Sequence, residues 1–382
     1  LRRACEEYTV DGECVALLGF EWMGNESVSN QKPGHHNVYY DSCSAPIADT
    51  SMDGLTGDSS LWAFMAEAEA DFGARSVSIP HASNFTGFNW EDRDNANRPV
   101  AEIYSEWGDS SGPMNDDGSS VYDGLALGNR LGFIGSSDNH DGWMGNRFAV
   151  KNVGGGLAAF VATDLSRAGI FESIELRSTY GTSGIRPVLR YWAEDGASVH
   201  MGEEYISQAP TFHWSYAAEN TLSTMELMAV AVDGSSGETT TLATWTPNAA
   251  SAEGESTWDW DGTPMAVWLV ATEDDGEMAW SSPIWLSSDC DNPSVLDPAG
   301  RCDSDSGGDS AQDNPIDDTH APKDSEKSID TADVDEATEP TVEAAVRCGC
   351  AVPTTQSRGL VLWIWTLFAV GWARSNRKRL RL

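Results

Sequence analysis

The chain has 382 residues, 40% of them apolar, so it is long enough for two domains with buried cores. Its 60 acidic and 23 basic residues give a net charge of −37. That charge repels phosphate backbones and argues against DNA or RNA as a partner, whereas it suits a protein that stays soluble outside the cell.

Residues 1–186 alternate short apolar runs with helical patterns. The runs VALLGFEW, HNVYY, SVSIPH, VAEIYS and LGFIGSSD predict buried strands. The segments SSLWAFMAEAEADFG, SVYDGLALGNR and ATDLSRAGIFESI predict helices, the last capped by Asp164. This alternation predicts a parallel β/α arrangement. The chain begins at Leu1 with neither Met nor signal peptide, so we expect its first strands to be missing.

Residues 187–288 have a different pattern, in which short strands alternate with polar turns. Examples are TFHWSYAAEN, TMELMAVAVDG, TTTLATW and MAVWLVATEDDG. This pattern predicts a small antiparallel β domain after the β/α portion.

Residues 289–347 contain 17 Asp or Glu, four Lys or Arg, and no Phe, Trp or Tyr. Such a segment buries too little apolar surface to offset its ordering entropy, which predicts an acidic disordered linker. Cys290 and Cys302 bracket a short polar loop without metal-type spacing, and we expect them to form a disulfide. Cys5 and Cys14 are a second candidate pair.

Residues 348–382 form the final segment. The apolar run from Gly359 to Ala373 has 15 residues and precedes a cluster of arginines and a lysine. This resembles the C-terminal sorting signals of myxobacterial surface proteins, with Cys350 or Cys348 at the processing site; a single-span membrane anchor is the alternative. Either way we expect an exported protein on the cell surface or outer membrane, whose C-terminal segment lies in the membrane before processing.

Metal-type side chains follow several of the predicted strands. Glu21, His81, Asp138 and His140 each come directly after an apolar run, and His35 precedes another. The carboxyl ends of strands in β/α barrels are where sites assemble, and mixed imidazole and carboxylate ligands suit divalent metals. The set predicts a metal site.

The motifs GFEWMG, GHHNVYY, IPHASN, AEIYSEWG, GFIGSSDNH, LRSTYGTSG and AWSSPIW appear in that order over roughly residues 10–287. This series resembles a bacterial branch of the polymerase-and-histidinol-phosphatase (PHP) superfamily that is described only as a domain of unknown function. The resemblance implies a distorted seven-stranded β/α barrel, similar to a TIM barrel, with two or three Zn, Mn or Fe ions.

The resemblance also implies a ligand set, and the sequence departs from it at one place. Five residues match the superfamily's ligand motifs: Glu21, His35, His81, Asp138 and His140. The first motif, His-x-His, is absent because the chain begins after it. His36 stays an alternative to His35, although Gly34-His35-His36-Asn37 fits the pattern Gly-His-x-Asn better.

These residues predict a hydrolase that uses a metal-activated water, with a phosphoester as the expected small-molecule substrate and Asp138 orienting the nucleophile. Four further residues are candidates for substrate contact: Asn84, Arg147, Arg177 and Tyr180. One alternative is a metal-dependent amide or lactone hydrolase. Another is a surface protein without catalytic activity whose tryptophans, such as Trp214, Trp258 and Trp260, bind a glycan or a protein partner.

Overall fold

A computed structural model of the chain describes residues 1–24, 32–48, 54–91, 94–112, 119–140, 154–207, 209–234 and 237–287, together with the backbone of 360–363. These residues all belong to one compact unit. Several predictions lie outside the described residues: the linker 289–347, the pair Cys290 and Cys302, the processing cysteines Cys348 and Cys350, and Arg147.

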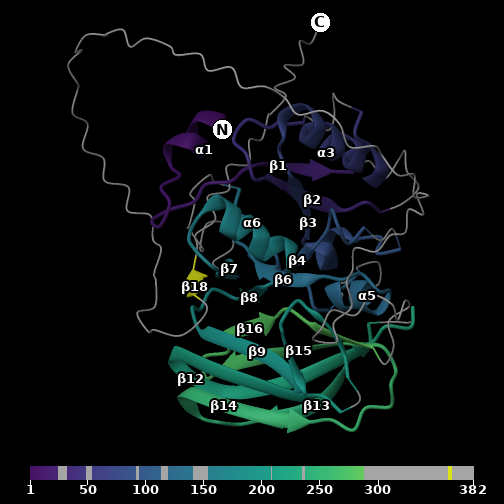
Figure 1. Cartoon of the computed structure of the whole chain (residues 1–382), viewed down its shortest axis with the longest axis vertical. Coiled ribbons are helices and arrows are strands. Elements are labelled where there is room, and N and C mark those ends of the chain that lie inside the picture. Colours follow the sequence, from purple (N-terminus) through teal and green to yellow (C-terminus); the bar gives the residue numbers. More distant parts are fainter. Residues whose placement is uncertain are drawn as a thin grey trace, which may run out of the picture. The chain divides into compact units, whose positions relative to one another are not determined.

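The first sheet contains β1 (Leu18–Met23), β2 (His35–Tyr40) and β3 (Ser76–His81), in that order and antiparallel throughout. The helix α3 (Asp58–Phe72) lies beside it, as Figure 1 shows, and buries Leu61 in one core with Phe20 of β1. Its Ala, Leu, Met and Glu residues favour a helix, which ends at Gly73 in the left-handed conformation. A short helix, α1 (Arg2–Glu7), precedes the sheet.

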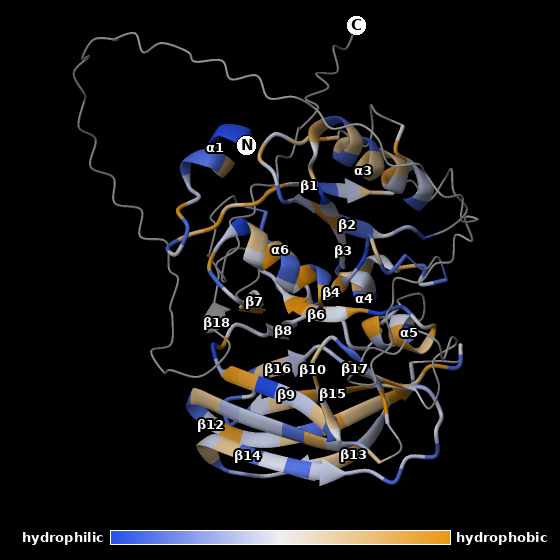
Figure 2. Ribbon diagram, viewed as in Figure 1, coloured by the Kyte–Doolittle hydropathy of each residue, from blue (hydrophilic) through white to orange (hydrophobic). Residues whose placement is uncertain are grey.

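The second sheet has the order β5-β4-β6 and is built from β4 (Val100–Ser105), β5 (Gly108–Asp109) and β6 (Gly132–Gly135). β4 and β6 run parallel, and their largely apolar colouring in Figure 2 agrees with their buried side chains. Two short helices lie near them, α4 (Ser83–Thr86) and α5 (Val121–Ala126). Ser120 and Asp123 cap α5 reciprocally.

The third and largest sheet has the main order β10-β9-β12-β15-β16-β8-β7-β18. Its strands are β7 (Leu157–Ala162), β8 (Thr179–Thr182), β9 (Val188–Asp195), β10 (Ala197–His200), β11 (Glu204–Ile206), β12 (Thr211–Ala231), β13 (Thr240–Trp245), β14 (Ala249–Thr257), β15 (Met265–Glu273), β16 (Met278–Ser281), β17 (Ile284–Ser287) and β18 (Leu360–Trp363). β7 and β8 therefore share a sheet with strands from beyond residue 187. The helix α6 (Arg167–Glu175) connects β7 to β8.

The expected β/α barrel is wrong. The fold is mostly β, with open and largely antiparallel sheets; among the described residues only β4 with β6 and β11 with β17 pair in parallel, and no sheet closes. The apolar runs do form buried strands, and β3 and β4 coincide with SVSIPH and VAEIYS. Local periodicity reports that a strand is buried but not which way its neighbour runs, so the strands were correct and their pairing was not.

Two local predictions are also corrected. Ser166, not Asp164, caps α6, because its hydroxyl accepts a hydrogen bond from the Gly169 amide at 3.0 Å. Cys5 forms its disulfide with Cys43 and not with Cys14. Both bonded cysteines lie in the core that α3 shares with β1 and β2.

Most tryptophans of the large sheet have their side chains in its hydrophobic core. Trp214 and Trp260 are buried there, and Trp258 packs against the same cluster. The outer strand β14 is polar to neutral in Figure 2, as its alternation of exposed and half-buried residues requires. No helix in the described part of the chain is long and apolar enough to cross a membrane.

Candidate metal centre

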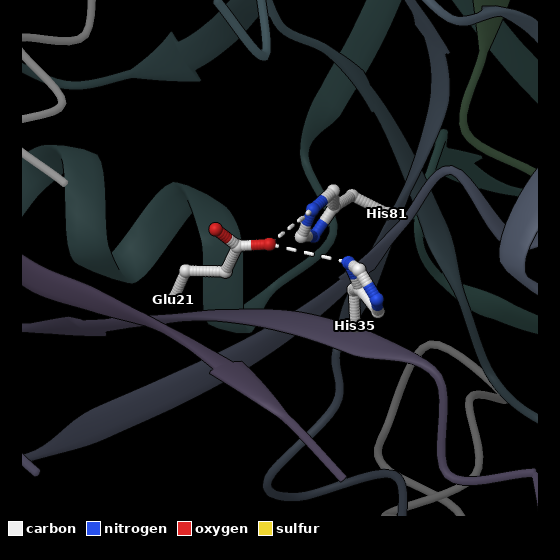
Figure 3. A group of neighbouring side chains, drawn as sticks. All are labelled: Glu21, His35 and His81. Atoms are coloured by element: carbon white, nitrogen blue, oxygen red, sulfur yellow. Dashed lines mark ion pairs between the residues drawn. The ribbon is translucent and has the colours of Figure 1, made fainter. Parts of the chain in front are cut away.

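Three adjacent strands bring Glu21, His35 and His81 together (Figure 3). Because β2 runs antiparallel to both neighbours, its first residue lies alongside the last residues of β1 and β3. His35 is the register partner of His81, and Glu21 is the partner of Asn37, two residues along β2 from His35. Side chains two apart share a face of a strand, so all three point to one side.

The carboxylate of Glu21 lies between the two imidazoles. Its Oε1 is 3.2 Å from Nδ1 of His35 and 3.4 Å from Nε2 of His81. One ligand atom from each of the three residues lies within 4.8 Å of the others. His81 is almost fully buried, and His35 and Glu21 are partly exposed. The group is therefore built into the sheet but open on one side.

His36 lies on the opposite face of β2, where both ring nitrogens have other partners. Its Nδ1 is 2.5 Å from Oγ of Ser78 and its Nε2 is 3.0 Å from the carbonyl of Pro33. Burial and the charge of Arg98 hold the pKa of His36 well below its usual value, so the ring is neutral. Of the two histidines, His35 is the one that the structure places beside Glu21 and His81.

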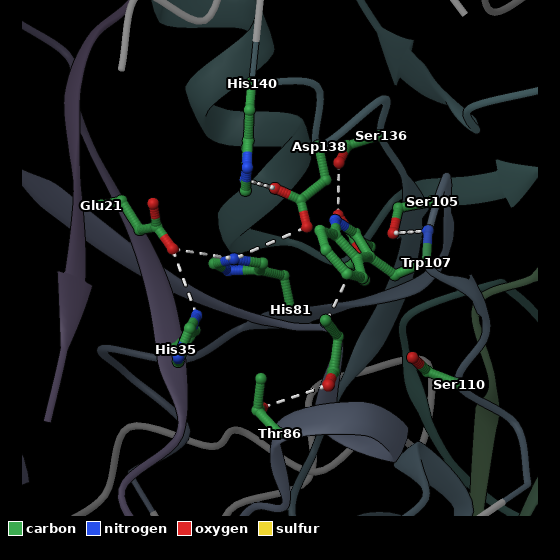
Figure 4. A network of polar contacts seen from close by, with 12 residues as sticks. Glu21, His35, His81, Thr86, Ser105, Trp107, Ser110, Ser136, Asp138 and His140 are labelled. Atoms are coloured by element: carbon green, nitrogen blue, oxygen red, sulfur yellow. Dashed lines mark hydrogen bonds and ion pairs between the residues drawn. The ribbon is translucent and has the colours of Figure 1, made fainter. Parts of the chain in front are cut away.

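Asp138 and His140 follow β6 and extend the group (Figure 4). The Asp138 Oδ2 atom is 3.8 Å from Nε2 of His81, and its Oδ1 is 3.8 Å from Nε2 of His140. His140 is 60% exposed, so it lies at the outer rim. Asp138 and Ala82, the residue after His81, both have φ of 47°. Left-handed backbone at residues other than glycine gathers at functional sites, which agrees with a site here.

Electrostatics around His81 favour positive charge. Burial alone would lower the pKa of His81, but its contact with Glu21 and the charges of Asp138 and Glu102 raise it to about 9. Burial would raise the pKa of Glu21, yet His35 and His81 together hold it well below its usual value. A site that stabilises an imidazolium beside an ionised carboxylate also attracts a metal cation.

Glu102 is the residue at this site that sequence reasoning missed. It lies in β4, is 1% exposed, and accepts hydrogen bonds from the Ser136 hydroxyl and, at 3.4 Å, from the Ala82 amide. Burial raises its pKa, and it joins Glu21 and Glu106 in raising the pKa of Asp138, after burial itself. The sequence feature that could have identified Glu102 is its position inside the apolar run VAEIYS, because a carboxylate on a buried strand needs a specific partner.

Three of the four residues predicted to contact substrate lie in the described part of the chain, and each has partners within the protein. The Asn84 side chain is buried, donates to the carbonyl of Asp109 and accepts from the Ser110 hydroxyl. Arg177 donates to the carbonyl of Gly202 at 3.1 Å, and Tyr180 donates to the carbonyl of Pro187 at 2.7 Å. These bonds join backbone segments.

The three-residue group has the donor atoms and spacing of a possible metal site. Ligand atoms in a tetrahedral site with bonds of about 2.1 Å lie about 3.4 Å from one another. The two distances from Oε1 of Glu21, 3.2 and 3.4 Å, are close to that spacing, and the whole set of ligand atoms lies within 4.8 Å. Two imidazoles and a carboxylate are also a donor set that suits Zn, Mn and Fe. The structure thus contains a candidate metal site at Glu21, His35 and His81.

The chain is thus a mostly β protein whose first antiparallel sheet carries two histidines and a carboxylate at one end. Comparison adds a family: residues 1–114 match the family described as "Protein of unknown function (DUF3604)". Glu21, His35 and His81 all lie inside the matched segment, and Asp138 and His140 lie beyond it.

One curated relative is similar over a longer stretch. The chain is 27% identical over 243 residues to an uncharacterized protein of Chlamydia pneumoniae. The match covers 55% of this chain and 38% of the relative. The chain therefore spans well under half the length of the curated protein that it matches.

Proposed function

We propose that this protein is a metal-dependent hydrolase that acts on phosphoesters. The observation that carries the proposal is the group of Glu21, His35 and His81, whose ligand atoms lie within 4.8 Å of one another. The ordered motifs that resemble the PHP superfamily support the same activity, with two or three Zn, Mn or Fe ions as the complete complement. The barrel of that superfamily is not part of the proposal.

Each residue has a distinct part in it. Glu21, His35 and His81 would hold the cation, which lowers the pKa of a bound water toward neutrality. Asp138 would orient the nucleophile; its two carboxylate oxygens lie 3.8 Å from ring nitrogens of His81 and His140, which supports this role. Asp138 and His140, whose Oδ1 and Nε2 atoms are 3.8 Å apart, would be further ligands when two or three ions are bound. Glu102 is buried and would help to hold the end of β3, where His81 lies, by accepting a hydrogen bond from the Ala82 amide.

We also propose that the protein is exported and tethered at the cell surface. The acidic composition of residues 289–347 and the apolar and basic tail after them support this. The Cys5–Cys43 disulfide is consistent with an oxidising compartment.

The test is a hydrolysis assay on protein loaded separately with Zn, Mn or Fe. We expect turnover of a phosphomonoester or phosphodiester that requires metal, and a loss of at least a hundredfold in kcat for Asp138→Asn with its thermal unfolding unchanged. His200→Ala, which alters an exposed histidine of β10, is the matched control and should retain full activity. Equal turnover with and without metal would contradict the proposal.

A further inference from the structure

Asn37 is a polar residue on the face of the first sheet that carries the candidate metal centre. It lies two residues from His35 on β2. Its register partners are Glu21 on β1 and Ile79 on β3. Residues two apart on a strand share a face, and residues directly opposite in an antiparallel pair have Cβ atoms about 5 Å apart. Asn37 is therefore adjacent to the centre, on the middle strand.

The distances within the centre place it over β2. Glu21 projects from β1, yet its Oε1 is 3.4 Å from Nε2 of His81 on β3. The same oxygen is 3.2 Å from Nδ1 of His35 on the strand between them (Figure 3). Because β2 separates β1 from β3, the Glu21 side chain reaches across β2. The step along β2 from His35 to Asn37 is about 7 Å, so a ligand bound at the centre can reach the Asn37 amide.

The side chain of Asn37 has no hydrogen-bond partner among the described residues. This is unusual for a half-buried amide on the middle strand of a sheet, because polar groups in such places are normally hydrogen-bonded within the protein. Ile79, its neighbour on β3, is apolar and buried and offers no donor or acceptor from its side chain. The amide is therefore free to bind a ligand.

The partly exposed side chain of Asn37 opens toward the centre. The opposite face of β2 is covered, since Val38 lies in the core that contains residues of α3. Further along the same face, the ring of Tyr39 lies against β1, where a Cβ at Gly19 would be 2.6 Å from its Cδ1 atom. Tyr39 is 3% exposed, so the face is closed on that side. The open side of Asn37 is the one toward His35, which is itself partly exposed.

We propose that Asn37 binds the substrate by donating an amide hydrogen to an oxygen of the phosphate held at the candidate metal centre. This inference rests on the proposed function and assigns a further residue to its site. Hydrogen bonds to an ionised acceptor are roughly twice as strong as those between neutral groups. An amide also keeps its donor at every pH at which the protein is folded, whereas a neighbouring carboxylate such as Glu21 only accepts when it is ionised.

Two variants test this on metal-loaded protein, with inorganic phosphate as the probe. Asn37→Ala and Asn37→Val both remove the donor, and Val also favours a strand, which protects the fold of β2. Calorimetry should show phosphate binding about tenfold more weakly to both, the usual effect of losing one hydrogen bond to a charged group. Asn220→Ala is the matched control, because Asn220 is an exposed amide of β12 in the large sheet, and it should bind phosphate as the parent does.

The metal content of the same proteins separates a residue that binds substrate from a metal ligand. It should stay at the level of the parent in both Asn37 variants. A loss of metal from both would overturn the inference, because Asn37 would then be a ligand. Phosphate affinity equal to that of the parent in a folded variant would also overturn it, while the proposed function stands. If the metal-loaded parent neither binds phosphate nor hydrolyses a phosphoester, the proposed function itself fails and the inference fails with it.

Discussion

His81 is the residue on which the electrostatics of the candidate centre converge. It is buried, and burial would normally keep an imidazole neutral, yet carboxylates on three sides raise its pKa to about 9. These carboxylates come from β1, β4 and the segment after β6, so the charge around His81 is assembled by the fold and not by neighbouring residues in the sequence. The arrangement has a measurable consequence for metal binding.

Metal binding should release protons, because a coordinated imidazole must give up its proton. With a pKa of about 9, His81 is protonated at neutral pH, so its proton competes with the ion until the pH rises past that value. We expect Mn affinity to increase by close to tenfold per pH unit between pH 6.5 and 8. Calorimetry in two buffers of different ionisation enthalpy measures this, and an affinity that is constant over the range would contradict the assigned environment of His81.

The sequence predicted Glu21, His35 and His81 because each stands at the boundary of an apolar run, where a polar residue is conspicuous. It left His35 and His36 open. In the antiparallel register His35 lies beside His81 and His36 faces the opposite side of the sheet, since adjacent residues of a strand point to opposite faces. Glu102 was not predicted, because it sits in the middle of its run. Its role depends on the contact between β4 and the loop after β3, which no local pattern reports.

Among the elements, β6 of the second sheet lies very close to β7 and β8 of the large sheet. Gly135, at the end of β6, illustrates this. A Cβ at that position would lie 2.7 Å from the carbonyl oxygens of both Leu157 in β7 and Thr182 in β8. Both are backbone atoms held in strands, so neither can move aside cheaply. Glycine at 135 is therefore required for β6 to reach the large sheet, and β6 leads directly to Asp138.

Gly135→Ala should destabilise the protein by about 2 kcal/mol, the usual cost of forcing atoms into a packed region. Gly112→Ala is the matched control, because a Cβ there would have no heavy atom within 4 Å, and we expect it to change stability by less than about 0.5 kcal/mol. Urea unfolding of the two variants and the parent gives both values. Equal stability of the two variants would mean that β6 is not packed as closely as described.

The Cys5–Cys43 disulfide joins the segment of α1 to the turn after β2 across 38 residues of chain. Closing a loop of that length in the unfolded chain corresponds to about 4 kcal/mol of stabilisation. The double variant Cys5→Ala and Cys43→Ala should lose close to that amount in urea unfolding under non-reducing conditions. Mass spectrometry that finds both thiols free in the parent, purified without reductant, would contradict the pairing.

Strand pairing marks the limit of what the sequence could predict about the fold. The order β2, α3, β3 reads as a strand, a helix and a strand, which is the pattern of a parallel unit, but β2 and β3 are antiparallel neighbours. A buried strand has the same composition in either orientation, and the long connection through α3 permits both. For the alternating strands around β12 the sequence did predict antiparallel pairing, because the turns between them are too short for a parallel connection.

At the scale of the whole molecule, the net charge of −37 and the tail after residue 348 bear on where the protein acts. Replacing Arg377, Lys378 and Arg379 with serine should release the protein into the medium, because the basic cluster stops transfer of the apolar run before it. The substituted positions follow β18, the part of the apolar run that pairs with β7, in the sequence. Immunoblotting of cell and medium fractions measures the release, and a protein that stays cell-bound would show that its retention lies elsewhere.

Metal binding by Glu21, His35 and His81 is the property on which the proposed activity depends. It is tested by measuring the metal content of four purified proteins with inductively coupled plasma mass spectrometry. The proteins are the parent, His35→Ala, His81→Ala and the control His200→Ala. We expect at least about one Zn, Mn or Fe ion per chain in the parent and the control, and a loss of most of that metal in each ligand variant. Metal content that is equal in all four proteins, or well below one ion in a parent grown with ample metal, would contradict the claim.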